Sequence, residues 1–135
     1  MKSVELNQEG NFDSWDFKKV EELRSGDIST NIGQNVLFEN NHVCLWEIHL
    51  LPNQRLPFRK QIQPHVWVCE KGGLAITRYA NAKIDLLYYE EGDTAYLEPK
   101  KNQRIYDLEN IGEDVLQLVI LEFKQPAPIP VDLKR

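Results

Sequence analysis

The sequence predicts an all-β domain, an antiparallel sandwich or barrel that follows a short N-terminal extension. From residue 34 onward, short segments rich in Val, Ile, Leu, Trp and Tyr recur at regular spacing. Residues that favour turns, mostly Asn and Gly, separate these segments, and no long stretch with helical periodicity interrupts them. About eight short strands at this spacing are typical of an antiparallel sandwich or barrel.

The expected strands are runs of β-branched and aromatic residues between turn signals. They cover residues 36–38, 42–51, 65–69, 74–79, 83–89, 94–97, 104–108 and 114–124. Within residues 51–73, prolines and the Gly72-Gly73 pair divide the chain into strand, turn, strand and glycine turn. Residues 80–82 predict the tip of a hairpin. The last strand is almost wholly apolar over residues 115–121, which predicts a central strand buried on both faces.

Two segments flank the predicted barrel at residues 34–124: an N-terminal extension at 1–33 and a Pro-rich tail at 125–135. In the extension, Ser14 fits the cap of a short helix through Leu23, but Trp15-Asp16-Phe17 also alternates as in a strand, so both remain open. We expect the extension to pack across an open sheet edge of the same subunit or a partner, because unpaired edges favour pairing. The prolines prevent the tail from continuing a strand ladder.

Length and charge restrict the function of the chain. Its 135 residues suffice for one domain with a hydrophobic core. The net charge of −5 argues against a nucleic-acid-binding surface, which needs clustered Lys and Arg. No apolar run approaches the ~20 residues that span a bilayer, and residues 1–5 do not resemble a signal peptide, so we expect no membrane partner and a cytoplasmic location. Cys44 and Cys69 lie in apolar strand patterns and are expected to be buried free thiols.

A recognisable spacing of residues lies between residues 51 and 73. Intervals of five, one, three and six residues separate Asn53, Arg59, Gln61, His65 and Gly72. This spacing resembles the first motif of the cupin superfamily, which has glycine, His-x-His, glutamate and glycine at these positions. The second cupin motif is matched less closely, with one extra residue before Pro99 and two before Tyr106. Its positions correspond to Gly92, Asp93, Pro99, Tyr106 and Asn110.

The resemblance implies a cupin-type double-stranded β-helix, which is a jelly-roll barrel. It also implies that the four metal-binding positions of the family correspond to Arg59, Gln61, His65 and Tyr106. Only His65 is a good metal ligand, because guanidinium is a permanent cation, an amide oxygen binds weakly and tyrosine must first lose a proton near pH 10. We therefore predict a retained pocket without the metal site and without a cofactor.

Each of these four residues also has a structural alternative. Arg59 and Gln61 share one face of an extended chain. An inward Arg59 is costly unless it is paired, so its partner is an anionic ligand or a carboxylate such as Glu70 or Asp93. His65 fits a core histidine equally well, and Tyr106 fits a wall residue whose hydroxyl bonds the backbone.

Two functions of different classes fit the four residues. In the first, which we favour, the barrel binds a small polar or anionic molecule, with Arg59 as the charge clamp, Gln61 and Tyr106 as hydrogen-bond donors and His65 as a pH-sensitive partner. In the second, His65 and Tyr106 are the acid/base pair of a metal-independent isomerase or epimerase, and Arg59 stabilises an enolate-like charge.

Two further alternatives are an interaction scaffold with a closed pocket, and a metal-dependent cupin enzyme in which His49 or Glu47 joins His65. Cupins similar to this chain are frequently homodimers, so the resemblance also implies a homodimer.

Overall fold

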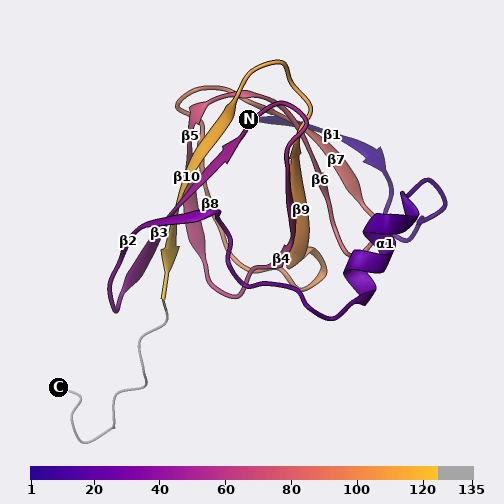
Figure 1. Ribbon diagram of the computed structural model, residues 1–135, viewed down its shortest axis with the longest axis horizontal. Coiled ribbons are helices and arrows are strands. Elements are labelled where there is room, and N and C mark those ends of the chain that lie inside the picture. Colours follow the sequence, from indigo (N-terminus) through magenta and orange to yellow (C-terminus); the bar gives the residue numbers. More distant parts are fainter. Residues whose placement is uncertain (125–135) are drawn as a thin grey trace, which may run out of the picture.

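Two five-stranded antiparallel sheets face each other in the computed structural model, which describes residues 1–124 (Figure 1). The first sheet has, in spatial order, β1 (Lys2–Asn7), β7 (Ile84–Tyr89), β6 (Gly73–Arg78), β9 (Ile105–Asn110) and β4 (Arg55–Lys60). The second has β2 (Asn35–Glu39), β3 (Val43–Leu50), β10 (Leu116–Phe123), β5 (His65–Lys71) and β8 (Thr94–Leu97). The helical elements are α1 (Phe17–Arg24) and the 3-10 turn η1 (Lys101–Gln103). The predicted all-β architecture is therefore confirmed.

Every strand expected from residue 34 onward is present, with ends that differ by a few residues. The strand, turn, strand and glycine turn expected between residues 51 and 73 correspond to β4, β5 and the turn before β6. The hairpin tip at residues 80–82 joins β6 to β7, where Ala82 has a positive φ of 82°. Cys44 and Cys69 are free and buried, as expected.

The N-terminal segment contains a strand that the sequence pattern did not indicate. β1 pairs with β7, the strand that otherwise forms the edge of the first sheet. The expectation that the extension packs across an open sheet edge is confirmed within this chain. The strand was missed because both of its faces remain largely exposed, so its residues show no alternation of polar and apolar side chains.

The open choice between helix and strand at residues 14–17 is resolved as the helix α1. Its N-cap is Asp16, not Ser14, and the Asp16 side chain accepts a hydrogen bond from the backbone N–H of Lys18 at 3.0 Å. Just before the helix, the Trp15 indole donates to the carbonyl oxygen of Ala82 at 2.9 Å and stacks on Phe58 with ring centroids 6.1 Å apart. These contacts fix α1 against the outer face of the first sheet.

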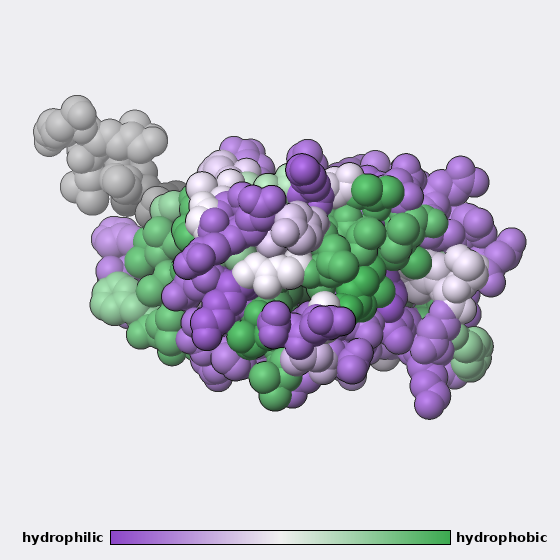
Figure 2. All heavy atoms as spheres, turned by 90° about the horizontal axis from the view of Figure 1, so that it is seen from above, coloured by the Kyte–Doolittle hydropathy of each residue, from purple (hydrophilic) through white to green (hydrophobic). Residues whose placement is uncertain are grey.

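The prediction that the last strand is buried on both faces is wrong. β10 is central, between β3 and β5, but its residues alternate between buried and half-buried. Val119 and Leu121 point to the outer face of the second sheet, which no other described element covers completely. Figure 2 likewise shows hydrophobic surface, in green, on both sides of a hydrophilic band when the molecule is seen from above.

One end of the space between the sheets is closed by residues 29–33, which run from α1 toward β2 (Figure 1). Ile32 is 1% exposed and belongs to the core, and the Lys60 N–H donates to the Ser29 carbonyl oxygen at 2.8 Å. A Cβ on Gly33 would lie only 2.4 Å from the Cβ of Trp46, so glycine permits this close approach. The segment is therefore part of the core of the fold.

No helix within residues 1–124 is long and apolar enough to cross a membrane. The expectations for the Pro-rich tail fall on residues 125–135, outside the described residues.

Candidate functional site

A cavity of about 200 Å³ lies between the two sheets, and all four residues singled out by the motif spacing line it. Arg59 comes from β4, Gln61 follows that strand, His65 begins β5 and Tyr106 lies on β9. Among the exposed lining residues, Met1 precedes β1, while Glu98 and Lys100 follow β8. The mouth of the cavity therefore lies between the start of β1 and the segment that follows β8.

An irregularity in β4 directs Arg59 into the cavity. The register between β4 and β9 shifts between Leu56 and Arg59, so that Leu56 lies opposite Leu108 and Arg59 lies opposite Tyr106. Between these two pairs, two residues of β4 lie opposite one residue of β9. This is a β-bulge, which changes the direction in which the following side chains point. Phe58 is left on the outer face, where it stacks on Trp15. The bulge thus allows residues 56 and 59, which have opposite parity, to face the interior together.

Arg59 is a buried cation without a carboxylate partner. The residue is 2% exposed, and two of its guanidinium nitrogens donate to the carbonyl oxygens of Ile32 at 2.9 Å and Pro57 at 3.1 Å. Its Nε has no hydrogen-bond partner within the described chain. Burial lowers the pKa of Arg59 to about 10, so the side chain is still protonated at neutral pH. The suggested pairing with Glu70 or Asp93 is not present.

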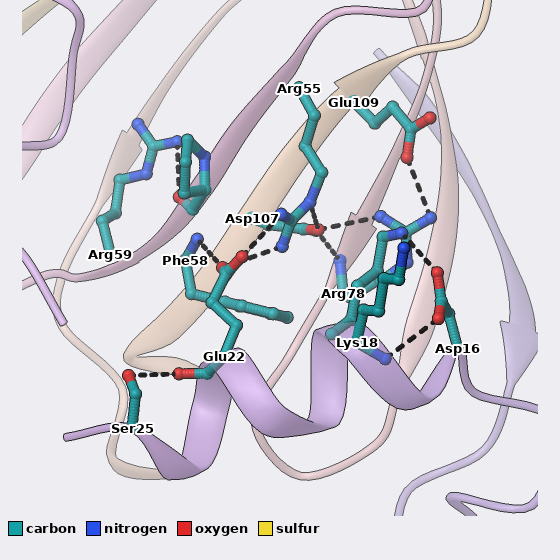
Figure 3. Close-up of polar contacts among 12 residues, drawn as sticks. Asp16, Lys18, Glu22, Ser25, Arg55, Phe58, Arg59, Arg78, Asp107 and Glu109 are labelled. Atoms are coloured by element: carbon teal, nitrogen blue, oxygen red, sulfur yellow. Dashed lines mark hydrogen bonds and ion pairs between the residues drawn. The ribbon is translucent and has the colours of Figure 1, made fainter. Parts of the chain in front are cut away.

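The contrast with the neighbouring arginines is visible in Figure 3, where Arg59 lies apart from a cluster of ion pairs. Asp107 is 0% exposed and accepts hydrogen bonds from Arg55 at 2.7 Å and from Arg78 at 2.8 Å. Glu22 of α1 pairs with Arg55 at 2.8 Å, and Glu109 pairs with Arg78 at 2.9 Å. Glu22, Asp107 and Glu109 are therefore matched with other cations, and this includes Asp107, which also contributes to the cavity lining.

The amide of Gln61 is already engaged. Its Nε2 donates to the carbonyl oxygens of Gln63 at 3.0 Å and Leu97 at 3.2 Å. Both amide hydrogens therefore have backbone acceptors. In this arrangement the Gln61 side chain leaves its amide oxygen, an acceptor, without one of these backbone partners.

His65 is 2% exposed, and its Nδ1 has no hydrogen-bond partner within residues 1–124. Burial lowers the pKa of His65 to about 4, so the imidazole is neutral at pH 7. Glu122, which is also buried, lies directly opposite His65 on β10. The Glu122 carboxylate accepts a hydrogen bond from the Trp46 indole at 3.0 Å. The residue opposite His65 is thus a carboxylate tied to the core, outside the cavity lining.

Tyr106 presents a protonated hydroxyl at neutral pH. Burial raises its pKa to about 12, with Glu122 raising it and Arg59 opposing the shift. Tyr79 lies beside it, with ring centroids 6.2 Å apart, and Tyr89 also lines the cavity. Burial raises the pKa of Tyr79 to about 12 as well. The tyrosines therefore add neutral hydroxyl groups to the wall.

The four motif positions do not fit a divalent metal ion. A protonated guanidinium repels a cation, the Gln61 amide nitrogens already donate to carbonyl oxygens, and Tyr106 keeps its proton at neutral pH. His49 and Glu47 lie on β3 with parity opposite to the inward residue Ile48, so neither joins His65. Within residues 1–124, no three His, Cys, Asp or Glu side chains are placed to hold a metal ion.

The structure adds site residues that the motif spacing did not indicate. Thr77, Tyr79 and Tyr89 line the cavity from β6 and β7 or next to them, and Glu122 lies behind His65. Only Glu122 carried a signal in the sequence, since it shares parity with the apolar residues Leu116, Leu118 and Ile120. A carboxylate on the buried side of a strand indicates a special environment.

Two motif positions have the backbone conformation that the pattern requires. Asn53 stands where the cupin motif has its first glycine, and its φ is 70°, a left-handed conformation that asparagine tolerates better than most residues. A Cβ on Gly72 would lie 2.1 Å from the carbonyl oxygen of Tyr89, so only glycine fits there. The motif asparagine Asn110 is buried and donates to the Leu50 and Asp114 carbonyl oxygens at 2.8 Å each.

Comparison with solved structures gives similar folds at low sequence identity. A cupin domain from Bordetella pertussis is 14% identical, with a TM-score of 0.59 over 67% of this chain and 91% of that chain. A double-stranded β-helix domain protein from Klebsiella pneumoniae is 17% identical, with a TM-score of 0.53 over 77% and 85%. An RmlC-like cupin from Methanocaldococcus jannaschii is 19% identical, with a TM-score of 0.51 over 68% and 79%.

No protein-family model and no curated protein matches the sequence. The similarity to the solved structures agrees with the two antiparallel sheets of this chain. The resemblance suggested by the residue spacing is confirmed at the level of the fold: this chain has a double-stranded β-helix fold similar to that of these solved cupin structures.

Proposed function

We propose that the chain binds a small anionic molecule in its cavity, without a metal ion, and that Arg59 is the positive anchor. The observation that carries the proposal is a cation 2% exposed, lining a cavity and lacking a carboxylate partner within the described residues. Burying an unpaired charge costs several kcal/mol, and a bound anion removes much of that cost. The cavity has room for such a molecule beside the guanidinium.

The other residues of the site have roles that follow from their protonation states. The Tyr106 hydroxyl, with a pKa of about 12, donates a hydrogen bond to the anion. The Gln61 oxygen and the neutral imidazole of His65 accept hydrogen bonds from hydroxyl or amide groups of the ligand. A closed interaction scaffold fits less well, because a cavity of about 200 Å³ remains: Trp46 and Phe58 do not line it, and Trp67 lines it without filling it.

The experiment that tests this proposal is a thermal-shift screen of small carboxylates and phosphorylated sugars with wild-type, Arg59→Gln and Lys60→Gln proteins. Lys60 neighbours Arg59 but does not line the cavity, so it controls for the loss of one positive charge. We expect stabilisation by at least one anion in the wild type and in Lys60→Gln, and none in Arg59→Gln. Equal stabilisation of all three proteins would refute the role of Arg59.

Metal analysis by inductively coupled plasma mass spectrometry, after incubation with Fe, Mn, Ni and Zn, tests the metal-free part of the proposal. Less than a tenth of an equivalent per chain supports it. One tightly bound equivalent contradicts it, because Arg59, Gln61 and Tyr106, in the protonation states described above, do not complete a metal site with His65.

Acid–base catalysis is the second candidate, since His65 and Tyr106 line the same cavity. A histidine with a pKa of about 4 is a weak base at pH 7, which disfavours this function. Exchange of the α-proton of a bound 2-oxo acid or ketose with solvent deuterium, followed by NMR, would reveal it. Exchange that His65→Gln abolishes would favour the enzyme over the binding protein.

A further inference from the structure

We propose that the ligand is an amphipathic monocarboxylate, with its carboxylate beside Arg59 and an apolar body against the aromatic and aliphatic wall of the cavity. This inference rests on the proposed function and narrows it from small anions in general to one chemical class. It depends on three features of the cavity: the distribution of polar residues, the number of buried cations and the size.

Along three pairs of neighbouring strands, the residues on the buried side change from polar to apolar within two or three positions, although the polar residues Glu122 and Asp85 lie outside the cavity lining. Because strands pair in fixed register, the polar pairs form one layer of the interior and the apolar pairs form the next. The opposing pairs are Arg59–Tyr106 and then Leu56–Leu108, His65–Glu122 and then Trp67–Ile120, and Thr77–Asp85 and then Ala75–Leu87. A ligand that spans both layers needs one polar end and one apolar end.

The polar layer offers a single positive charge. Arg59 is the one buried cation among the described residues that line the cavity. Lys100 and Met1 are exposed at the mouth, where the Met1 amino group pairs with Asp93 at 2.8 Å. Of the two carboxylate residues in the lining, Asp107 is paired with Arg55 and Arg78, and Glu98 is exposed at the mouth. One unpaired cation matches one carboxylate, whereas a doubly charged phosphate group would remain half-compensated in this interior.

The apolar layer suits a flat or unbranched hydrocarbon body. Trp67 and Tyr89 meet edge to face, with ring centroids 5.2 Å apart, and Leu108, Leu118 and Ile120 complete the wall. Apart from the Tyr89 hydroxyl and the Trp67 indole N–H, this wall has no groups that hydrogen-bond the hydroxyls of a sugar, and buried polar groups without partners are costly. The composition of the wall therefore favours an aromatic or aliphatic acid over a hydrophilic anion.

The volume sets the size of the ligand. A water molecule takes about 30 Å³ in the liquid, so the cavity of about 200 Å³ holds a molecule the size of benzoate or hexanoate. Larger acids do not fit without movement of the wall. Acetate fits but leaves most of the apolar surface without contact.

Isothermal titration calorimetry with benzoate, butyrate, hexanoate, benzamide, inorganic phosphate and glucose 6-phosphate tests the inference. We expect benzoate to bind more than tenfold tighter than the neutral benzamide. Hexanoate should bind roughly fifteenfold tighter than butyrate, since each buried methylene contributes about fourfold. Phosphate and glucose 6-phosphate should bind weakly or not at all.

Three variants accompany the titrations. Arg59→Gln should weaken benzoate binding more than tenfold. Arg59→Lys, which keeps the charge, should retain part of the affinity. It provides the comparison if Arg59→Gln does not fold. Lys60→Gln should bind as the wild type does, because its side chain lies outside the cavity lining.

The outcomes separate the ligand class from the proposed function. Arg59-dependent binding of glucose 6-phosphate or phosphate, without benzoate or hexanoate binding, overturns the amphipathic class and leaves anion binding standing. Equal affinities for butyrate and hexanoate also overturn it. If no anion binds, or if benzoate binds Arg59→Gln as tightly as the wild type, both the class and the proposed function are wrong.

Discussion

At the scale of single residues, Arg55 and Arg59 show how the same side chain can have opposite effects on stability. Both lie on β4, but Arg55 pairs with Glu22 and Asp107 while Arg59 has only backbone carbonyl partners. A pKa of about 10 for Arg59, against the usual 12.5, means that its charge opposes folding by about 3 kcal/mol. Hydrogen bonds to Glu22 and Asp107 outweigh burial and raise the pKa of Arg55.

Replacing each arginine by methionine should therefore change the free energy of unfolding in opposite directions. Arg59→Met should keep or raise the stability of the ligand-free protein by about 1–2 kcal/mol, because the lost hydrogen bonds offset part of the relieved charge burial. Arg55→Met should lower it by about 2–4 kcal/mol, because Asp107 and Glu22 lose their partner. Urea unfolding at pH 7 measures both. A large loss of stability in Arg59→Met would mean that its charge is already compensated.

His65 should make the folded protein sensitive to mild acid. Its pKa is about 4 in the folded state and about 6.5 in the unfolded chain. The unfolded state therefore binds more protons between these values, so stability falls as the pH decreases from 6.5 to 4. Between pH 7 and pH 5 we expect the wild type to lose about 2 kcal/mol more than His65→Leu.

Urea unfolding of both proteins at the two pH values measures the difference, in which the contributions of other titrating groups cancel. NMR titration of the His65 imidazole gives an independent value. A pKa near or above 6.5 would show that the Glu122 carboxylate opposite, and not burial, determines the charge of the imidazole.

The residues of the candidate site could be predicted from the sequence to the extent that they follow strand parity and motif spacing. Arg59, Gln61, His65 and Tyr106 share one cavity, as the spacing indicated. The use of the Gln61 amide hydrogens could not be predicted, because their acceptors depend on how the chain turns after β4 and on the end of β8. The pairing state of Arg59 likewise depends on residues distant in the sequence.

At the scale of elements, α1 and the bulge in β4 are linked through Glu22. Its carboxylate pairs with Arg55 and also accepts a hydrogen bond from the backbone N–H of Phe58, at 2.9 Å, inside the bulge (Figure 3). The sequence spacing alone could not predict this bulge, since its stabilising contact comes from a helix 36 residues earlier. The helix thus helps to hold the conformation that directs Arg59 inward.

Glu22→Gln should weaken both the fold and the site. We expect a loss of about 1–3 kcal/mol in the free energy of unfolding, since a charge-assisted pair and a backbone contact become weaker. Binding of an anion that depends on Arg59 should weaken as well, because the bulge is held less firmly. Glu21→Gln is the matched control, since Glu21 is exposed on the same helix. Calorimetry measures the anion affinity of the two variants, and urea unfolding measures their stability; both should be lower for Glu22→Gln. Equal values for the two variants would show that α1 does not support the site.

At the scale of the whole molecule, the N-terminal extension packs on the strand region as part of the same sheets and core. The apolar strand pattern from residue 34 onward was sufficient to predict the sheets, because alternation reports directly on burial. The same pattern did not predict which residues of the extension pair with the edge of the first sheet and complete the core. β1 extends the first sheet, and Ile32 completes the core beside Trp46.

A chain that begins at residue 34 should therefore fail to fold into the native structure. Loss of residues 1–33 removes β1, removes α1 with Glu22, and removes the Ile32 carbonyl oxygen that accepts a hydrogen bond from Arg59. In the full chain, Ile32→Ala should cost about 2–4 kcal/mol as a large-to-small change in a packed core. Leu37→Ala, at a residue 50% exposed, should change stability by less than about 0.5 kcal/mol. Circular dichroism and urea unfolding compare the three proteins, and a cooperative, native-like transition in the truncated chain would show that residues 34–124 fold independently.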